Sequence, residues 1–461
     1  MEKSSLASQP VQAPNNPAKS RPSRLPGRFA RLPELAGPGF LPLGLFARLP
    51  LAMLTVGTLT LVTAVSHSYA IGGMAAGAVG IGSAVGAPVL GSLADRAGQR
   101  PVLLVASVVN TLAVAGLLAA TYRTPSYGSP AEAIAVLGAA FVAGASCPQV
   151  GPMARVRWMA LTARNLAMAR GAGDGAPTGG QAGASPSVAA NRADLDTALS
   201  YEGTADEITF VLGPALVGLL ASIVAPWLPL ALAAAMTIVL VPLFAVHPSQ
   251  RAVVPQPKKS PAAVGRSTGG TKRRSAAAVV AVPVAAMVCM GTFFGATQNA
   301  LSAFGAQFAT AEIAGLLYSV MGLSSAVAAL SVAFWPQRFG LAARWVAAAL
   351  AMTVLSLLLL LPSGIWAMVL VLLFLGIPVG PVMVTVFSIG GAVAPRGRMA
   401  TVMTALASGI VAGTALGAYL GGQLAQAQGY GGAFLVSTAA ALGLLLLGLV
   451  TWLVMRGKEK A

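Results

Sequence analysis

GSLADRAGQR, residues Gly91 to Arg100, is the clearest polar segment in a chain that is otherwise mostly apolar. An apolar run at residues 69–90 precedes it, and another at residues 101–122 follows it. A helix needs about 20 predominantly apolar residues to cross the hydrocarbon core of a bilayer. Each run therefore predicts a membrane-spanning helix, and the polar segment predicts the loop that joins them.

The composition of the whole chain indicates an integral membrane protein. Of its 461 residues, 56% are hydrophobic and only 9% are charged, and the mean hydropathy is +0.78. Soluble domains carry about 25% charged residues, so lipid must be the solvent for most of this chain. The apolar runs predict twelve spans, at residues 40–65, 69–90, 101–122, 133–156, 204–224, 228–246, 276–298, 313–335, 344–361, 366–389, 399–420 and 433–455.

The basic residues predict which side of the membrane each loop faces. The net charge of +17 would suggest nucleic-acid binding in a soluble protein. Here, however, all but Arg48 and Arg123 of the 29 lysines and arginines fall on one side of the predicted spans. Because cytoplasmic loops carry the excess of positive charge, we expect a multi-pass plasma-membrane protein with both termini in the cytoplasm and no nucleic-acid partner. All six tryptophans lie near predicted span ends, as interfacial anchors do.

Short internal repeats divide the spans six and six. FVAGASCPQVGP in the fourth span is similar to FLGIPVGP in the tenth, and PQRFG after the eighth span is similar to ADRAG in the Gly91 loop, with Gln337 in place of Asp95. We therefore expect an all-α fold of twelve transmembrane helices in two six-helix bundles. The expected parts are a disordered basic cytoplasmic tail (1–39), the first bundle (40–248, with a flexible insertion at about 170–193), a basic cytoplasmic linker (249–275), the second bundle (276–455) and a short cytoplasmic tail (456–461).

Several classes of protein are excluded by what the sequence lacks. Cys147 and Cys289 both lie in apolar runs, where they form neither a disulfide framework nor a metal-binding spacing. His67 and His247 fall at opposite predicted membrane faces. No catalytic triad and no complete nucleotide-binding motif is present. We expect no enzyme activity, no cofactor and no metal site.

The Gly91 loop resembles the signature loop between the second and third spans of the major facilitator superfamily. Its Gly91, Asp95, Arg96, Gly98 and Arg100 fit that pattern, whereas Gln99 stands where a basic residue is common. The resemblance implies a secondary transporter whose two halves rock about a central cavity. It also implies that Asp95 accepts hydrogen bonds from the start of the eleventh helix, near Met399, and so locks the halves together on the cytoplasmic side. The alternative is an ordinary polar turn with arginines that reach the membrane surface.

A second resemblance lies in the fifth span. Gly213, Pro214 and Gly218 are similar to the antiporter motif of the superfamily, although Val217 replaces the first of its paired glycines. The resemblance implies export. Alternatively, these residues only allow close packing of helices.

The charged residues near the membrane are candidates for proton coupling. Asp206 and Glu207 are expected in the first turn of the fifth span, where they could bind protons, complement the helix dipole or pair with Arg155 and Arg157. Arg48 lies about two turns into the first span, where it is either functional or extends to the surface. Among the 12 carboxylates, the sequence places four near the membrane: Asp95, Asp206, Glu207 and Glu312.

The family resemblance implies that the first, fourth, seventh and tenth helices line the cavity. Their few polar side chains include Thr55, Gln149, Gln298 and Thr385. An apolar wall with scattered hydroxyls and amides suits an amphiphilic solute. We therefore expect a monomer that exports a drug-like compound or metabolite in exchange for protons. The alternatives are uptake or facilitated diffusion of a small metabolite, and a non-transporting membrane scaffold or sensor on the same fold.

Overall fold

The fold is entirely built from helices in the part of the chain that the computed structural model describes, which is residues 27–127, 132–171, 186–255, 269–308, 313–336 and 338–459. Within these ranges, eleven helices are long and apolar enough to cross a membrane. The last of them, Met399–Leu453, has 55 residues and breaks at Gly429, where φ is 71° and ψ is −169°. A helix of that length extends about 80 Å, and the core of a bilayer is about 30 Å thick. The element therefore provides two crossings, and the fold class predicted from the sequence is confirmed.

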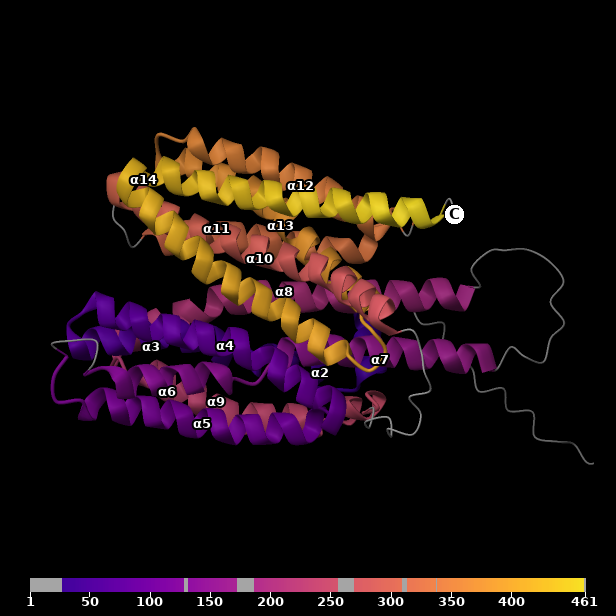
Figure 1. Ribbon diagram of the computed structural model, residues 1–461, viewed down its shortest axis with the longest axis horizontal. Helices are drawn as coiled ribbons and strands as arrows, with labels where there is room; N and C mark the ends of the chain where they lie inside the picture. The colour runs from indigo at the N-terminus through magenta and orange to yellow at the C-terminus, as the bar shows by residue number, and fades with distance from the viewer. Residues whose placement is uncertain are drawn as a thin grey trace, which may run out of the picture.

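The first half of the chain supplies six crossings, which lie together in one layer of the molecule (Figure 1). They are α2 with α3 (Phe40–Phe46 and Leu49–Ser66), α4 (Tyr69–Ala97), α5 (Gln99–Arg123), α6 with α7 (Ile134–Ala145 and Val150–Gly171), α8 (Pro186–Ile223) and α9 (Leu228–Val246). The fourth crossing is interrupted before Val150, because Pro148 has no N–H to donate to the helix. The Gln149 side chain bridges the interruption by donating to the Cys147 carbonyl at 3.0 Å.

The second half supplies the other six crossings and forms the second layer (Figure 1). A short 3-10 helix, η2 (Pro248–Ala252), follows the first half. The crossings are α10 (Gly269–Phe308), α11 with η4 (Ile313–Ser331 and Val332–Phe334), α12 with η5 (Leu341–Leu357 and Leu358–Leu360), α13 (Ile365–Val393) and the two parts of α14 (Met399–Glu459). The helix α10 begins within the predicted linker, of which residues 256–268 lie outside the described residues.

Glycines have no side chain and let helices approach at distances that no other residue allows. Such close packing matters in a membrane, because lipid offers little hydrophobic drive for helix association. A Cβ placed on Gly413 of α14 would lie 2.0 Å from the Val288 carbonyl oxygen of α10. A Cβ on Gly417, one turn later, would lie 2.1 Å from the Thr292 carbonyl oxygen. The segment IVAGTALGA of α14, residues 410–418, is therefore part of the packing surface between α10 and α14.

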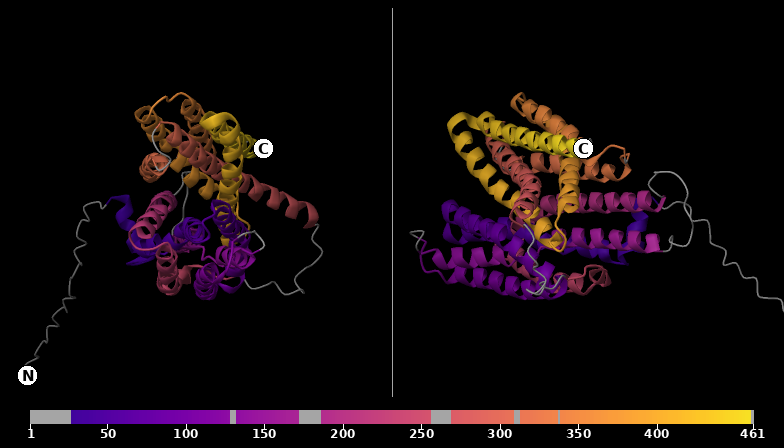
Figure 2. Two further views of the ribbon diagram at one scale, coloured as in Figure 1. Left: turned by 90° about the vertical axis from the view of Figure 1, so that its left-hand side faces the viewer. Right: turned by 45° about the vertical axis from the view of Figure 1, so that its right-hand side comes forward.

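The two halves meet at the end of the molecule where α4 ends and α14 begins, which we call the Asp95 side. The helices α7 and α8 extend beyond the other spans on this side (Figures 1 and 2). A buried cluster of Leu199, Ala329, Val332 and Val384 joins α8 to α11, η4 and α13 there. The contact between the halves thus involves the ends of the helices that lead toward the Asp95 side.

The segment before the first span is also structured. A 3-10 helix, η1 (Arg28–Arg31), and a short helix, α1 (Leu32–Ala36), occupy part of the tail that the sequence predicts to be disordered. Pro33 lies in the first turn of α1, where its missing N–H leaves no helix hydrogen bond unmade. Leu32 and Ala36 are buried. Residues 1–26 of the predicted tail lie outside the described residues.

Gly413→Ala should destabilise the protein, because the new methyl group would collide with the Val288 backbone and force α10 and α14 apart. Overpacking of this kind costs about 1–3 kcal/mol, so the melting temperature of the purified protein in detergent should fall by several degrees. The matched control is Gly218→Ala, where a Cβ meets nothing within 4 Å. An unchanged melting temperature for Gly413→Ala would contradict the packing described above.

Candidate functional site

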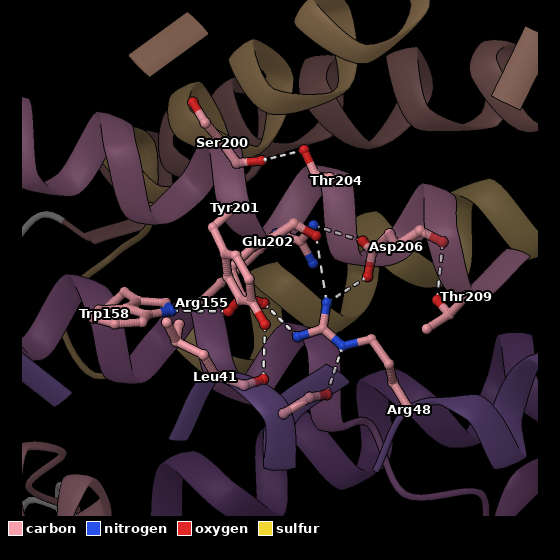
Figure 3. Close-up of polar contacts among 11 residues, drawn as sticks. Leu41, Arg48, Arg155, Trp158, Ser200, Tyr201, Glu202, Thr204, Asp206 and Thr209 are labelled. Carbon is pink, nitrogen blue, oxygen red and sulfur yellow. Dashed lines mark hydrogen bonds and ion pairs between the residues drawn. The ribbon is translucent and has the colours of Figure 1, made fainter. Parts of the chain in front are cut away.

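Arg48 is the centre of a buried charge network on the Asp95 side (Figure 3). It lies at the junction of α2 and α3 and is only 4% exposed. Its Nε donates to the Gly44 carbonyl at 2.9 Å, and its two terminal nitrogens reach Glu202 at 2.5 Å and Asp206 at 2.8 Å. A charge removed from water is tolerated only when it is paired and hydrogen-bonded, so these carboxylates hold Arg48 inside the bundle.

Two residues of α7 complete the network. Arg155 donates to the second oxygen of Asp206 at 2.6 Å, and the Trp158 indole N–H donates to Glu202 at 2.8 Å. Two arginines and two carboxylates therefore neutralise one another. The network joins the first, fourth and fifth crossings. We call Arg48, Arg155, Trp158, Glu202 and Asp206 the charge network.

The structure corrects the expected position of the acidic residues. The helix α8 begins at Pro186, between five and six turns before Asp206, and not at residue 204, where the predicted span starts. Asp206 and Glu207 consequently lie in the middle of a long helix. The expected flexible insertion is helical from residue 186 onward, and residues 172–185 lie outside the described residues. Of the two arginines considered as partners, Arg155 pairs with Asp206, whereas Arg157 does not.

The sequence prediction missed Glu202. It lies one turn before Asp206 on the same helix face and is almost completely buried. The i, i+4 spacing of two carboxylates, combined with an arginine in the first span, was the signal that could have identified the pair. Trp158, expected at the membrane interface, is instead fully buried, and so is Trp345. Glu312 lies outside the described residues.

The charge network also contacts the second half of the molecule. The Arg155 guanidinium lies over the Phe387 ring of α13, with its carbon 3.9 Å from the ring centre. On α8, the Thr204 hydroxyl donates to the Ala326 carbonyl of α11 at 3.0 Å. Both contacts would break if the halves separated on this side.

Glu207 differs from the other carboxylates of α8. Its side chain is buried, and its Oε1 has no hydrogen-bond partner. Ser325 of α11 lies close enough to interact with it, and the Ser325 hydroxyl also lacks a hydrogen bond. No ion pair to Glu207 is formed among the described residues. A buried carboxyl group without a compensating charge therefore lies where α8 faces α11.

Asp95 makes the contact that the family resemblance implies. One carboxylate oxygen accepts from the Ala400 amide at 2.9 Å, and the other accepts from the Thr401 amide at 2.8 Å and the Thr401 hydroxyl at 2.6 Å. The free N–H groups and the dipole of a helix start favour an anion at this place. We call this contact between α4 and the start of α14 the Asp95 latch.

The remaining residues of the Gly91 loop have distinct positions. A Cβ on Gly91 would lie 2.7 Å from the Ala400 carbonyl oxygen, so glycine is needed for α4 to reach α14. Gly98 ends α4 with φ at 91°, a conformation that glycine adopts readily. Arg96 and Arg100 are exposed.

Gln99, which stands where the family commonly has a basic residue, is buried and binds α7. Its amide donates to the Met153 carbonyl at 3.2 Å and accepts from Arg157 at 2.8 Å. Arg157 also donates to the Phe244 carbonyl and stacks on the Phe244 ring. Position 99 thus carries an amide where the family commonly has a basic residue, and the arginine that binds this amide comes from α7.

Of the two glycines in the fifth-span motif, only Gly213 is closely packed against another helix. A Cβ on Gly213 would lie 2.6 Å from the Ala52 side chain of α3, so this glycine brings α8 close to the first crossing. Pro214 lies inside α8 without ending it. A Cβ added to Gly218 would meet no atom within 4 Å. This geometry agrees with close helix packing and carries no information on the direction of transport.

The four expected cavity residues occupy different environments. Thr55 on α3 and Gln298 on α10 are exposed. Gln149 is buried at the interruption of the fourth crossing, and Thr385 on α13 is buried with a hydroxyl that has no hydrogen-bond partner. A cavity of about 440 Å³ lies between the halves on the Asp95 side, where Asp196 of α8 and Arg344 of α12 face it. A second cavity, of about 590 Å³, lies beside Trp366 at the start of α13.

Replacing Arg48 by methionine should destabilise the protein strongly, because Glu202 would lose its cation and Asp206 one of its two. Breaking a buried ion pair costs about 3–5 kcal/mol. Adding Glu202→Gln to Arg48→Met should recover part of the loss, since the pair Arg155 and Asp206 remains neutral. Thermal unfolding in detergent would measure both effects, with Arg123→Met at an exposed helix end as the control. A double variant as unstable as the single one would contradict the pairing.

Comparisons with known proteins agree with this architecture. Residues 39–407 match the Major Facilitator Superfamily. The fold is similar to that of the human organic anion transporter MFSD10 (TM-score 0.63, 17% identity, 92% of this chain and 100% of that chain covered). It is also similar to a bacterial homologue of the iron transporter ferroportin in an outward-facing state (0.62, 14%, 89% and 97%) and to the fucose:proton symporter of E. coli (0.58, 14%, 89% and 98%). Curated protein sequences yield no match. The family match extends over more than half of the sequence, and the chain belongs to the major facilitator superfamily.

Proposed function

We propose that this protein is a proton-coupled secondary transporter that exports an amphiphilic small molecule across the plasma membrane. The observation that carries the proposal is the buried carboxyl group of Glu207 between the two halves. The family makes the protein a transporter. Substrate class, proton coupling and direction are the steps that we add.

Glu207 is suited to carry a proton because of where it lies. An ionised carboxylate without a cationic partner is costly inside a membrane protein, and Arg48 and Arg155 are already engaged by other carboxylates. Glu207 lies on α8, whereas its neighbour Ser325 lies on α11. Separation of the halves would admit water to Glu207 and let the proton exchange. A carboxyl group at a moving interface links protonation to the change of conformation.

The surroundings favour a substrate with a large apolar part. The helices that line the cavity in this family carry few polar side chains here, and Thr55 and Gln298 are the exposed ones among the four candidates. An apolar pocket with a few polar groups binds amphiphiles better than strongly charged solutes. The similar structures carry titles that name an organic anion, iron and fucose, and a shared fold does not select among substrates.

Two observations support the proposed direction of transport. The excess of basic residues on the Asp95 side supports a cytoplasmic location for that side. The Asp95 latch would then close the cytoplasmic entrance, as in an outward-facing transporter. The resemblance of Gly213, Pro214 and Gly218 to the antiporter motif supports exchange of substrate for protons.

Proton movement driven by substrate would test the proposal directly. Purified protein in liposomes would be screened with cationic and neutral amphiphiles under an imposed pH gradient. The parent should move protons opposite to the substrate. Glu207→Gln should bind the same compound but lose the coupled proton flux, since the amide cannot release a proton. Glu34→Gln, at an exposed carboxylate of α1, is the matched control and should behave like the parent.

Each other outcome has a defined meaning. Protons that move in the same direction as the substrate would contradict export and indicate a symporter. Substrate flux without proton flux would replace the proposal by facilitated diffusion. Unchanged coupling in Glu207→Gln would show that another group carries the proton.

A further inference from the structure

We propose that residues 28–36, which we call the N-terminal strap, form a second latch between the two halves on the Asp95 side. The strap is anchored on the first half and grips the end of α11 in the second half. It must therefore release one of them whenever the Asp95 side opens. This inference goes beyond the proposed function, because it depends on neither the substrate nor the coupling ion.

The anchor of the strap is buried. Leu32 is completely inaccessible and Ala36 is 4% exposed, both within the core cluster that includes Trp158 of the charge network. Phe40, just beyond the strap, packs edge-on against Trp158 with ring centres 5.1 Å apart. Arg31 forms an ion pair with Asp194 of α8 at 3.3 Å. The strap is thus held by the first half along most of its length.

The grip on the second half is made by two residues. The Arg28 guanidinium donates to the Ala333 carbonyl of η4 and lies over the Phe334 ring, 5.5 Å from its centre. Phe29 packs edge-on against the same ring, with the centres 6.0 Å apart. Arg28 is exposed, and Phe334 is 59% exposed. The grip is at the surface and the anchor is buried, so the grip is the contact that releases first.

The position of the grip explains why a second latch is needed. In the first half, Asp95 of the Gly91 loop holds the start of α14. The corresponding segment of the second half, PQRFG, has Gln337 in place of Asp95 and lacks that carboxylate. The strap binds Ala333 and Phe334, which Trp335 separates from this segment.

A further ion pair closes the same region. Arg344 of α12 lies 3.6 Å from Asp196 of α8 and also donates to the Phe339 and Pro336 carbonyls. It therefore shapes the PQRFG turn and ties it to the first half. The strap and this ion pair together supply the contacts that the altered repeat does not make.

A cysteine reporter inside the interface would measure how often the Asp95 side opens. Ala329 is fully buried on α11 and faces Gly203 of α8, so Ala329→Cys should react with a soluble maleimide only in the open state. The native cysteines would first be replaced by alanine. The rate of labelling would be compared for the purified reporter protein and for variants of the grip, without substrate or pH gradient.

Removing the grip with Arg28→Ala and Phe29→Ala should raise the labelling rate roughly fivefold, the effect expected for losing a surface cation–π contact and an aromatic pair. Phe334→Ala should do the same from the other half of the molecule. Combining all three should add little beyond either change, since they remove one contact. Glu34→Ala, on the exposed face of the strap, should leave the rate unchanged.

The proposal is overturned if the grip variants label at the parental rate, or if the strap and Phe334 changes are additive. Thermal unfolding would be followed for each variant, so that faster labelling from general unfolding is recognised. Phe334→Ala lies outside the strap and keeps the test decisive if the strap variants do not fold. Because the assay contains no substrate, its failure would leave the proton-coupling proposal untouched.

Discussion

The need to neutralise Arg48 inside the membrane governs the first half of this transporter. An arginine at the start of a span can reach the surface, but this one turns inward and binds two carboxylates of α8. Those carboxylates in turn bind Arg155 and Trp158 of α7. Three crossings are thus joined by charge-assisted hydrogen bonds, which are about twice as strong as neutral ones. We therefore expect these three crossings to move as one body.

The contact between the halves is of a different kind. It includes a small buried cluster, the Asp95 latch, a stacked arginine and a few hydrogen bonds on the Asp95 side, together with the larger core cluster that contains apolar residues of both halves. Such contacts are individually worth about 0.5–3 kcal/mol, so they can break and re-form during a transport cycle. A rigid half and a breakable interface are what alternating access requires. Glu207 lies at that interface, where opening and protonation can influence each other.

Much of the fold could be predicted from the sequence, because each crossing needs a long apolar run. The contact of Asp95 with the start of α14 could be predicted too, since a helix start attracts an anion and the loop resembles a known motif. The start of α8 could not be predicted from the sequence. Its first turns carry alanine and polar residues after a Gly-rich segment, a composition that is typical of linkers. The contact of this part of α8 with the strap is the ion pair between Asp194 and Arg31.

The N-terminal strap was missed for a similar reason. The tail that contains it, residues 1–39, is rich in proline and arginine, a composition typical of disordered tails. Pro33 is compatible with a helix only because it lies in the first turn. The partner of Arg48 was missed because Glu202 belongs to the segment that was placed outside the membrane. In each case local composition indicated one state and tertiary contact determined another.

The central claim is that the Asp95 latch keeps the Asp95 side closed. Spin labels at Arg100→Cys and Arg338→Cys, which are exposed positions in opposite halves on that side, would report their separation by electron–electron double resonance. The native cysteines would be replaced by alanine. We predict one short distance in the parent and an added population at longer distance in Asp95→Asn, whose neutral amide is a weaker acceptor for the start of α14. An identical distribution in both proteins would contradict the account.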